Sequence, residues 1–318
     1  MMAKQIVSGV LLLNKPSGIS SHTALSHAKR LFMSSEFDSK KAGHTGTLDP
    51  MATGLLPICL GDATKFSSFG LDADKGYTAV IQLGERTDTG DKDGQIINTL
   101  PIPSFTQEDL TDIAHALTGE QRQTPPMYSA LKKDGKKLYE YAREGIEIER
   151  EARPIVIHRL ALTKLSDDEI ALDVVCSKGT YVRVLGETVA ERLGTVGHLT
   201  ALHRTSTGGF HMADAVSLDD LANLSFDERF GKLLPIDVLL HHLPIVKLTA
   251  DESTRIKMGQ RLNIKDRLDE LTFDETIQIR LYHDDDFVGL GQVAMSGRLQ
   301  PIKICQTSAT GKMRHAML

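Results

Sequence analysis

The sequence predicts an α+β protein of two domains, residues 1–243 and 244–318. Two observations lead to this prediction. In the first part, β-branched apolar runs such as residues 77–83 occur together with stretches of helical periodicity such as residues 105–117. After residue 243, short strand-like runs separated by turns follow one another, which is typical of a small antiparallel β domain. A chain of 318 residues is long enough for this division.

The composition is that of an ordinary globular protein, with 41% hydrophobic and 25% charged residues. Three widely separated cysteines argue against a disulfide framework or a cysteine zinc site and favour the reducing cytoplasm. No apolar run has the roughly eighteen residues of a membrane helix, and residues 10–13 are interpreted as a buried strand rather than a signal peptide. The formal net charge of −5 means that any RNA contact must come from a local basic patch.

The chain begins with a predicted strand, residues 7–13. A helix is expected next, because Ser20 or Ser21 can supply an N-cap and apolar residues then recur at helical spacing as far as Phe32. Residues 34–41 are expected to be a polar linker.

The linker leads into residues 43–54, which read GHTGTLDPMATG. The glycines permit positive φ, and Pro50 disfavours the helical region for Asp49, so the stretch is predicted to be a shaped loop that presents one carboxylate. Leu48 and Met51 can hold the loop against a core. From these residues alone, a turn in which Asp49 only bonds its own backbone is the alternative. A phosphate-binding loop is disfavoured because no Gly-Lys-Ser/Thr follows.

The segment after this loop is predicted to contain two strands and a helix. Residues 55–60 and 77–83 are the strands, and residues 105–117 form an amphipathic helix with Thr106 as N-cap. The acidic loop at residues 84–94 lacks the regular aspartates and terminal glutamate of a calcium loop, so that interpretation is rejected.

The strongest basic patch lies in residues 124–143. Interleaved tyrosines could stack on bases there, although a solvated helix face is the ordinary alternative for such a run. The lysines are Lys132, Lys133, Lys136 and Lys137, and the tyrosines are Tyr139 and Tyr141.

Residues 154–160 and 170–176 are predicted to pair as strands. The segment SKGTYVRVL, residues 177–185, then leads into a helix with Tyr181 and Arg183 in its first turn, away from the apolar stripe. A cation is unfavourable near a helix N-terminus, so Arg183 is expected to have a partner carboxylate elsewhere in the chain.

Residues 198–210, HLTALHRTSTGGF, carry Leu202 and Arg204, and a short helix follows. His241 and His242 have no neighbouring cysteine or carboxylate cluster and are interpreted as exposed polar residues rather than metal ligands. The predicted helix and the strand-like runs of the second domain are residues 217–224, and then 245–248, 276–282, 287–295 and 300–305.

The stretch GHTGTLDPMATG resembles the catalytic signature of the TruB-type pseudouridine synthases, in which the aspartate is the catalytic residue. LLLNKPSGISS (residues 11–21), SKGTYVRVL and HLTALHRTSTGGF resemble further motifs of this family, in the same order. The resemblance covers nearly the whole chain. It implies a pseudouridine synthase fold, a mixed and mainly antiparallel sheet flanked by helices and loops, followed by a small β-barrel PUA-like RNA-binding domain. Because every motif with a chemical role lies before residue 210, this domain is expected to add affinity rather than chemistry.

The resemblance also implies an activity: conversion of uridine to pseudouridine at position 55 in the T-arm of tRNAs. The reaction cleaves the N1–C1′ bond and rejoins the uracil through C5 without redox change, so no cofactor or metal is expected. Asp49 could attack C1′, add to C6 or abstract a sugar proton, and a close Arg183 is expected to lower its pKa. The expected partner is the tRNA T stem-loop alone, bound by a monomer in the cytoplasm, with no protein partner or membrane.

Further roles follow from the resemblance residue by residue. Tyr77 would stack under the flipped base and is a candidate base for the C5 proton. Lys15 and Pro16 would support the floor of the site, and from the sequence alone a solvated turn lysine is the alternative for Lys15. His44, Tyr181 and Leu202 match other substrate-contacting positions. Residues 124–152 match a mobile insert, the thumb, that grips the RNA, and the RNA-contacting candidates are Lys132, Lys133, Lys136, Lys137 and Arg204.

Two other classes of function are weighed against this one. A non-catalytic RNA-binding or tRNA-folding protein could use the same RNA-contacting segments with an inactive site. A glycosidase normally needs two positioned carboxylates, and the motifs offer one. A synthase assay on RNA and on free uridine separates these classes.

Overall fold

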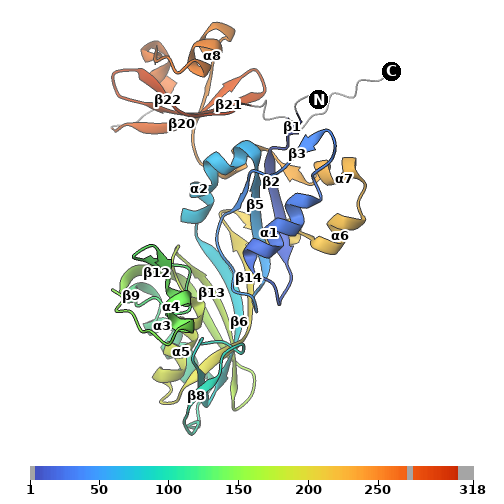
Figure 1. Cartoon of the computed structure of the whole chain (residues 1–318). Helices are drawn as coiled ribbons and strands as arrows, with labels where there is room; N and C mark the ends of the chain where they lie inside the picture. Colours follow the sequence, from blue (N-terminus) through green and yellow to red (C-terminus); the bar gives the residue numbers. More distant parts are fainter. Residues whose placement is uncertain (1–3, 271–274, 307–318) are drawn as a thin grey trace.

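The computed structural model describes residues 4–270 and 275–306, and the molecule is elongated (Figure 1). A long twisted sheet carries most of the chain, and a smaller sheet lies at one end of it. Within the described ranges, no helix is long and apolar enough to cross a membrane. The α+β class predicted from the sequence is confirmed.

The large sheet is mixed and mainly antiparallel, as expected. In spatial order its strands are β16 (Val216–Ser217), β2 (Gly9–Lys15), β5 (Thr53–Leu60), β14 (Gly197–Thr207), β6 (Lys75–Leu83), β13 (Glu169–Cys176), β12 (Arg153–Lys164) and β9 (Gly119–Gln123). Three further strands pair beside this path: β4 (Ala42–His44), β15 (Phe210–His211) and β17 (Leu233–Leu234). The parallel pairs are β14 with β5 and β16 with β2.

Strand β2 is buried on both faces. Leu11 belongs to one buried cluster and Leu12 to a second cluster on the other side of the sheet. Because both faces are covered, the strand reads as a continuous apolar run instead of an alternating one. The interpretation of residues 10–13 as a buried strand is confirmed, and the strand extends to Lys15.

The helices predicted in the first domain are present, with small shifts at their ends. Thr106 caps α3 and forms a capping box with Asp109, so local sequence fixes this helix start. The polar linker is only partly irregular, because β3 (Phe37–Asp38) pairs with β1 (Gln5–Ile6). The helices are α1 (Ser21–Arg30), α2 (Ser67–Asp72), α3 (Gln107–Ala116), α5 (Val182–Arg192), α6 (Leu218–Asn223) and α7 (Phe226–Gly231), joined by the 3-10 turns η1 (Gly61–Phe66), η2 (Met212–Asp214) and η3 (Ile236–Leu240).

The basic segment does not form a single helix. Strands β10 (Lys132–Lys133) and β11 (Lys136–Lys137) make a hairpin, and α4 (Leu138–Arg143) follows it. Asp134 and Gly135 both have positive φ, which is the two-residue turn that an Asp-Gly pair favours. The helix alternative is therefore wrong for the lysines, which lie on a hairpin. A second small hairpin, β7 (Glu85–Thr87) with β8 (Ile96–Thr99), spans the acidic loop.

The smaller sheet is open and curled, consistent with a PUA-like domain. Its order is β18 (Ile245–Lys247), β20 (Ile277–His283), β21 (Asp286–Val293), β22 (Arg298–Ile304) and β19 (Leu262–Asn263). β18 pairs with β20 in parallel, so the expectation of a purely antiparallel domain is wrong at this edge. Periodicity also missed α8 (Ala250–Lys257), because only Ala250 and Ile256 are apolar in this helix. Its capping box, Thr249 with Glu252, was the available signal. The turn η4 (Lys265–Glu270) follows β19.

The smaller sheet packs directly against the larger part of the chain. The Phe66 and Phe287 rings meet edge to face, with centroids 5.5 Å apart, inside the cluster that also contains Leu12. Beside them, Arg280 forms an ion pair with Asp237, 3.2 Å between Nη1 and Oδ2. The second buried cluster is thus shared by both sheets, which fixes their relative position.

Candidate active site

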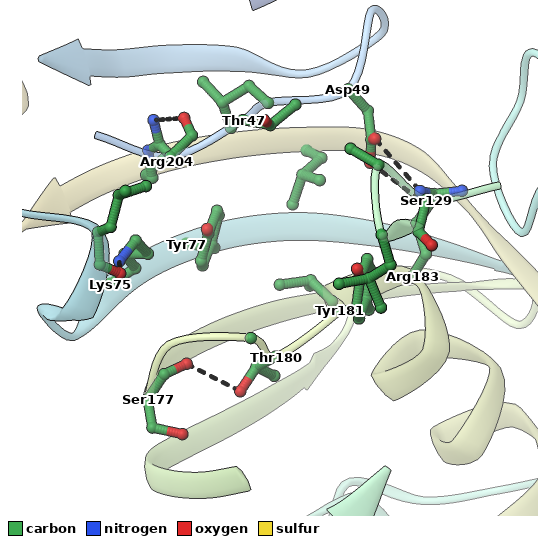
Figure 2. Close-up of a pocket in the computed structure, with 18 residues that line it drawn as sticks. Thr47, Asp49, Lys75, Tyr77, Ser129, Ser177, Thr180, Tyr181, Arg183 and Arg204 are labelled. Atoms are coloured by element: carbon green, nitrogen blue, oxygen red, sulfur yellow. Dashed lines mark hydrogen bonds and ion pairs between the residues drawn. The ribbon is translucent and has the colours of Figure 1, made fainter. Parts of the chain in front are cut away.

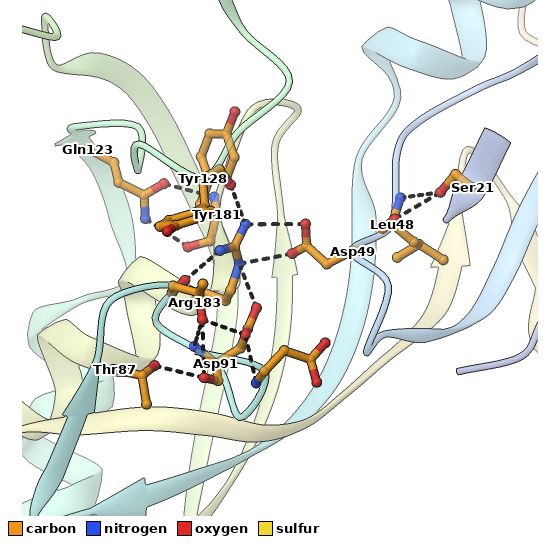
Figure 3. Close-up of polar contacts among 11 residues, drawn as sticks. Ser21, Leu48, Asp49, Thr87, Asp91, Gln123, Tyr128, Tyr181 and Arg183 are labelled. Carbon is orange, nitrogen blue, oxygen red and sulfur yellow. Dashed lines mark hydrogen bonds and ion pairs between the residues drawn. The ribbon is translucent and has the colours of Figure 1, made fainter. Parts of the chain in front are cut away.

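Buried apolar side chains and hydrogen bonds from α1 hold the loop that carries Asp49 in place. Leu48 and Met51 are buried, as the sequence suggested. Ser21, the first residue of α1, bonds both backbone groups of Leu48, accepting from N at 2.7 Å and donating to O at 2.9 Å (Figure 3). These contacts leave the Asp49 side chain 31% exposed on the open side of the loop.

Lys15 lies fully buried beneath the same loop. Its Nζ donates to the carbonyl oxygens of Pro16 (2.8 Å), Pro50 (3.2 Å) and Ala52 (2.7 Å). Burial lowers the pKa of Lys15 to about 8, which Asp49 partly opposes. The ammonium group thus bonds the backbone on both sides of Met51, the supporting role that the resemblance implied for Lys15.

Asp49 forms a two-pronged ion pair with Arg183. Arg183 Nε lies 2.9 Å from Asp49 Oδ2, and Nη2 donates to Oδ1 at 3.2 Å (Figure 3). Arg183 is 3% exposed and also donates to the carbonyl oxygens of Thr89 (2.5 Å) and Tyr128 (2.8 Å). The cation in the first turn of α5 therefore has the carboxylate partner that helix electrostatics called for.

Arg183 lowers the pKa of Asp49, as expected, but the net shift of this pKa is upward. Burial raises the pKa of Asp49, and Asp91 raises it further, while Arg183 and Lys15 lower it. Arg183 cannot offset the burial fully because its charge is shared: Asp91 Oδ2 lies 3.7 Å from the same Nε. The sequence showed the cation but not the depth of the pocket or the second carboxylate.

Asp49 opens into a pocket of about 310 Å³ (Figure 2). The pocket collects six of the site residues singled out in the sequence: Asp49, Tyr77, Tyr181, Arg183, Leu202 and Arg204. They come from the loop before β5, from β6, from the start of α5 and from β14. An anionic carboxylate beside two phenols and an aliphatic side chain can act as nucleophile or base toward a planar ring held in this pocket.

The strand pairing at the pocket floor depends on Gly54. A Cβ at Gly54 would lie 2.4 Å from the Arg204 carbonyl oxygen, and the residue has φ +104°. Only glycine therefore permits the parallel pairing of Gly54 with Arg204 between β5 and β14. Arg204 in turn donates from Nε to Leu55 O (2.6 Å) and from Nη2 to Gly46 O (3.1 Å).

Other predicted residues lie outside this pocket. His44 is on β4, and its Nδ1 is buried without a hydrogen-bond partner in the described part of the chain. Burial lowers the pKa of His44, with a smaller effect from Arg204. Lys132 and Lys133 are exposed on the hairpin, whereas Lys136 and Lys137 are half-buried. Substrate contact by His44 and RNA contact by these lysines stay predictions.

Sequence reasoning missed several residues that shape the site. Asp91 and the Tyr128 carbonyl bind Arg183, and the Gln123 side chain bonds both backbone groups of Tyr181 (2.8 and 3.1 Å). Ser129 lines the pocket, and its hydroxyl is buried. The sequence signals were the Gly- and Asp-rich loop of residues 84–94, which contains Asp91, and the basic segment of residues 124–143, which contains Tyr128 and Ser129. Within the described ranges, no group of His, Cys, Asp and Glu is arranged to hold a metal ion.

Two family models match the chain. The model of the TruB family pseudouridylate synthase (N terminal domain) matches residues 34–182, and that of pseudouridine synthase II TruB, C-terminal, matches residues 244–304. The first match includes Asp49, Tyr77 and Tyr181 and ends one residue before Arg183. The second covers the smaller sheet.

Relatives and solved structures agree with these matches. The chain is 47% identical to the tRNA pseudouridine synthase B of Psychrobacter cryohalolentis, over 94% of each chain. It is also 47% identical to the proteins of that name from Aromatoleum aromaticum (97% of this chain, 96% of that protein) and Neisseria meningitidis serogroup B (96% and 97%). A chain in the crystal structure of a Cbf5-Nop10-Gar1 complex shares the fold, with a TM-score of 0.67 at 22% identity over 95% of this chain and 85% of that one.

Proposed function

The chain belongs to the TruB family of pseudouridylate synthases, and from this membership we propose that it converts uridine to pseudouridine at position 55, in the T-arm of tRNAs. It is therefore an isomerase that acts on RNA. The observation that carries the proposal is the Asp49–Arg183 pair at the wall of a pocket that Tyr77 also lines.

In this reaction Asp49 is the group that acts on the nucleotide. Arg183 holds both carboxylate oxygens and opposes the effect of burial on the Asp49 pKa, so it favours the charged form that the reaction requires. The target base must leave the RNA stack to enter the pocket, at a cost of a few kcal/mol. Stacking on Tyr77 would return about 1–3 kcal/mol of this. Tyr181 and Leu202 complete the walls, and His44 contacts the nucleotides next to the target.

We assign residues 1–243 to a catalytic domain and residues 244–318 to a PUA-like RNA-binding domain. The separate sheet and the family match at residues 244–304 support the division. Residues 124–152 act as the thumb, with lysines at the tip of a hairpin. Because the two sheets share the cluster around Phe66 and Phe287, removal of the second domain would expose apolar surface on the first.

The pH dependence of the reaction tests the electrostatic environment of Asp49. The reaction needs the ionised carboxylate, so kcat/KM falls as the pH drops through the Asp49 pKa. Arg183 lowers that pKa and Asp91 raises it. Arg183→Met should therefore move the acidic limb of the kcat/KM profile to higher pH, and Asp91→Asn should move it to lower pH. Profiles that do not move, or that move the same way in both variants, contradict this assignment.

The salt dependence of RNA binding tests the lysine hairpin. Neutralising the four lysines to glutamine should reduce the slope of log Kd against log salt by roughly one unit for each phosphate group that the hairpin no longer binds. The substituted residues are Lys132, Lys133, Lys136 and Lys137. A net-charge control neutralises four lysines elsewhere: Lys4, Lys40, Lys41 and Lys232. Equal slopes in the two variants would mean that the hairpin is an ordinary solvated surface.

The function itself is tested by mapping pseudouridine in tRNA by mass spectrometry, with and without the protein in cells. We expect loss of the modification at position 55 alone and its return with the intact gene. A protein that only binds or folds tRNA would leave the modification unchanged. We further propose that the protein works on tRNA as a monomer in the cytoplasm. The three buried, unpaired cysteines agree with the reducing compartment.

A further inference from the structure

Arg204 is a buried arginine without a carboxylate partner. It is 1% exposed, and no ion pair to it occurs within residues 4–270 and 275–306. Two of its nitrogens donate to the carbonyl oxygens of Leu55 and Gly46, whereas Nη1 makes no well-formed hydrogen bond in the described chain. An uncompensated buried charge costs several kcal/mol, so its retention beside the pocket points to a role in the reaction.

Tyr77 is the residue that faces this charge. Arg204 and Tyr77 are direct partners in the antiparallel pairing of β14 with β6, and both line the pocket (Figure 2). Directly opposed residues have Cβ atoms about 4.5–5.5 Å apart on one face of a sheet. A register shift immediately after Arg204 bends the strand at this point. Burial raises the pKa of Tyr77, and the positive charge of Arg204 is the largest effect that lowers it.

The second phenol in the pocket lies in a different environment. Burial raises the pKa of Tyr181 and the charge of Arg183 lowers it, but Arg183 is already paired with both Asp49 and Asp91. Lys75, another pocket residue, donates from Nζ to the carbonyl oxygens of residues 70, 71 and 73 and so has no free position for a proton from the substrate. Among the described residues that line the pocket, Tyr77 is the only tyrosine whose neighbouring cation, Arg204, is not paired with a carboxylate.

The proposed reaction needs a proton acceptor at its last step. When uracil is rejoined to C1′ through C5, that carbon still carries its original hydrogen. The hydrogen must leave as a proton, and the C5–H electron pair then restores the C5–C6 double bond. The π electron pair between C6 and N1 moves to N1, which takes up a proton from water. Asp49 has already served in the earlier steps and is paired with Arg183.

We propose that Arg204 is a positioning residue that holds Tyr77 ready to take the C5 proton. The phenolate oxygen of Tyr77 accepts the proton and becomes a neutral hydroxyl, which returns the proton to water after the product leaves. Arg204 supplies the positive charge that stabilises the phenolate and does not itself touch the base. The inference rests on the proposed function, and it gives Arg204 a role other than the RNA contact expected from the sequence.

A double-mutant cycle tests the link between the two residues. Tyr77→Phe and Arg204→Gln should each slow tritium release from 5-tritiated uridine in a T-arm stem-loop by about 10²–10⁴-fold, the usual contribution of a general base. The double variant should be at most about threefold slower than the slower of the two single variants, because both changes remove the same function. Tyr181→Phe combined with Arg204→Gln is the matched control, and its effects should multiply.

A second measurement separates charge from structure. Replacement of Tyr77 by a fluorotyrosine, a more acidic phenol, should restore much of the rate lost in Arg204→Gln, and Arg204→Lys should retain more activity than Arg204→Gln. A purely structural role of Arg204 would leave the fluorotyrosine without effect, and this result overturns the proposal. If Arg204→Gln does not fold, the same fluorotyrosine comparison in Arg204→Lys decides the question.

Two further outcomes are distinguishable. If Arg204 binds a substrate phosphate instead, Arg204→Gln reduces the salt slope of RNA binding by about one unit and multiplies with Tyr77→Phe, which overturns the inference. If the wild-type protein forms no pseudouridine in the same assay, the proposed function fails and not the Arg204 assignment. If the wild-type enzyme is active but the effects of Arg204→Gln and Tyr77→Phe multiply, only the role assigned to Arg204 is wrong.

Discussion

Asp49→Asn is expected to abolish turnover while leaving RNA binding intact. Asparagine keeps the size of the side chain and most of its hydrogen bonds, but it removes the charge and the nucleophile. The loop should stay folded because its supports come from Ser21, Lys15 and the buried Leu48, not from the carboxylate. Turnover should fall on the order of 10⁴-fold or more, since no second carboxylate lines the described pocket.

The measurement is tritium release from 5-tritiated uridine in a T-arm stem-loop, with filter binding in parallel. Asp93→Asn is the control, because it removes an exposed carboxylate from the neighbouring loop without touching the pocket. Binding by Asp49→Asn should equal or slightly exceed that of the wild type, as a negative charge near phosphates is lost. Activity within tenfold of wild type would make Asp49 a turn residue. Loss of binding together with turnover would contradict the expectation of an intact loop.

Gly54→Ala is expected to destabilise the fold by about 3 kcal/mol or more and to remove activity. The added Cβ would lie 2.4 Å from Arg204 O and 2.8 Å from Arg204 N, where backbone cannot move aside without breaking the β5–β14 pairing. The φ of +104° adds strain whatever the space. Displacement of Arg204 would disturb both Tyr77 and the Gly46 carbonyl.

Gly43→Ala in the same motif is the matched control for this change. Gly43 has nothing within 4 Å of an added Cβ and no positive φ. Its free energy of unfolding should stay within about 1 kcal/mol of wild type. Denaturant unfolding of the two variants measures the difference. Similar stabilities for both would show that the sheet adjusts at Gly54 and that the close approach is not a constraint.

The local signals in the sequence were sufficient for most of the fold. Alternating or continuous apolar runs located β2, β5, β6, β12 and β13, and Thr106 located the start of α3, but no strand was predicted for the central β14. They failed where a signal was short: two residues, Asp134 and Gly135, make the turn of a hairpin within a basic run, and α8 contains only two apolar residues. Periodicity needs two or more turns of helix to stand out from chance.

By itself the sequence determined that Asp49 sits alone on a glycine-framed loop and that Arg183, at a helix N-terminus, needs a carboxylate. The conformational effect of the motif glycines and the effect of the helix dipole extend over only a few residues, so both can be predicted from the sequence. Only the tertiary structure decided the direction of the Asp49 pKa, because burial and Asp91 act through space. It alone placed Arg204 opposite Tyr77, since strand register joins residues from distant parts of the chain and no local pattern encodes it.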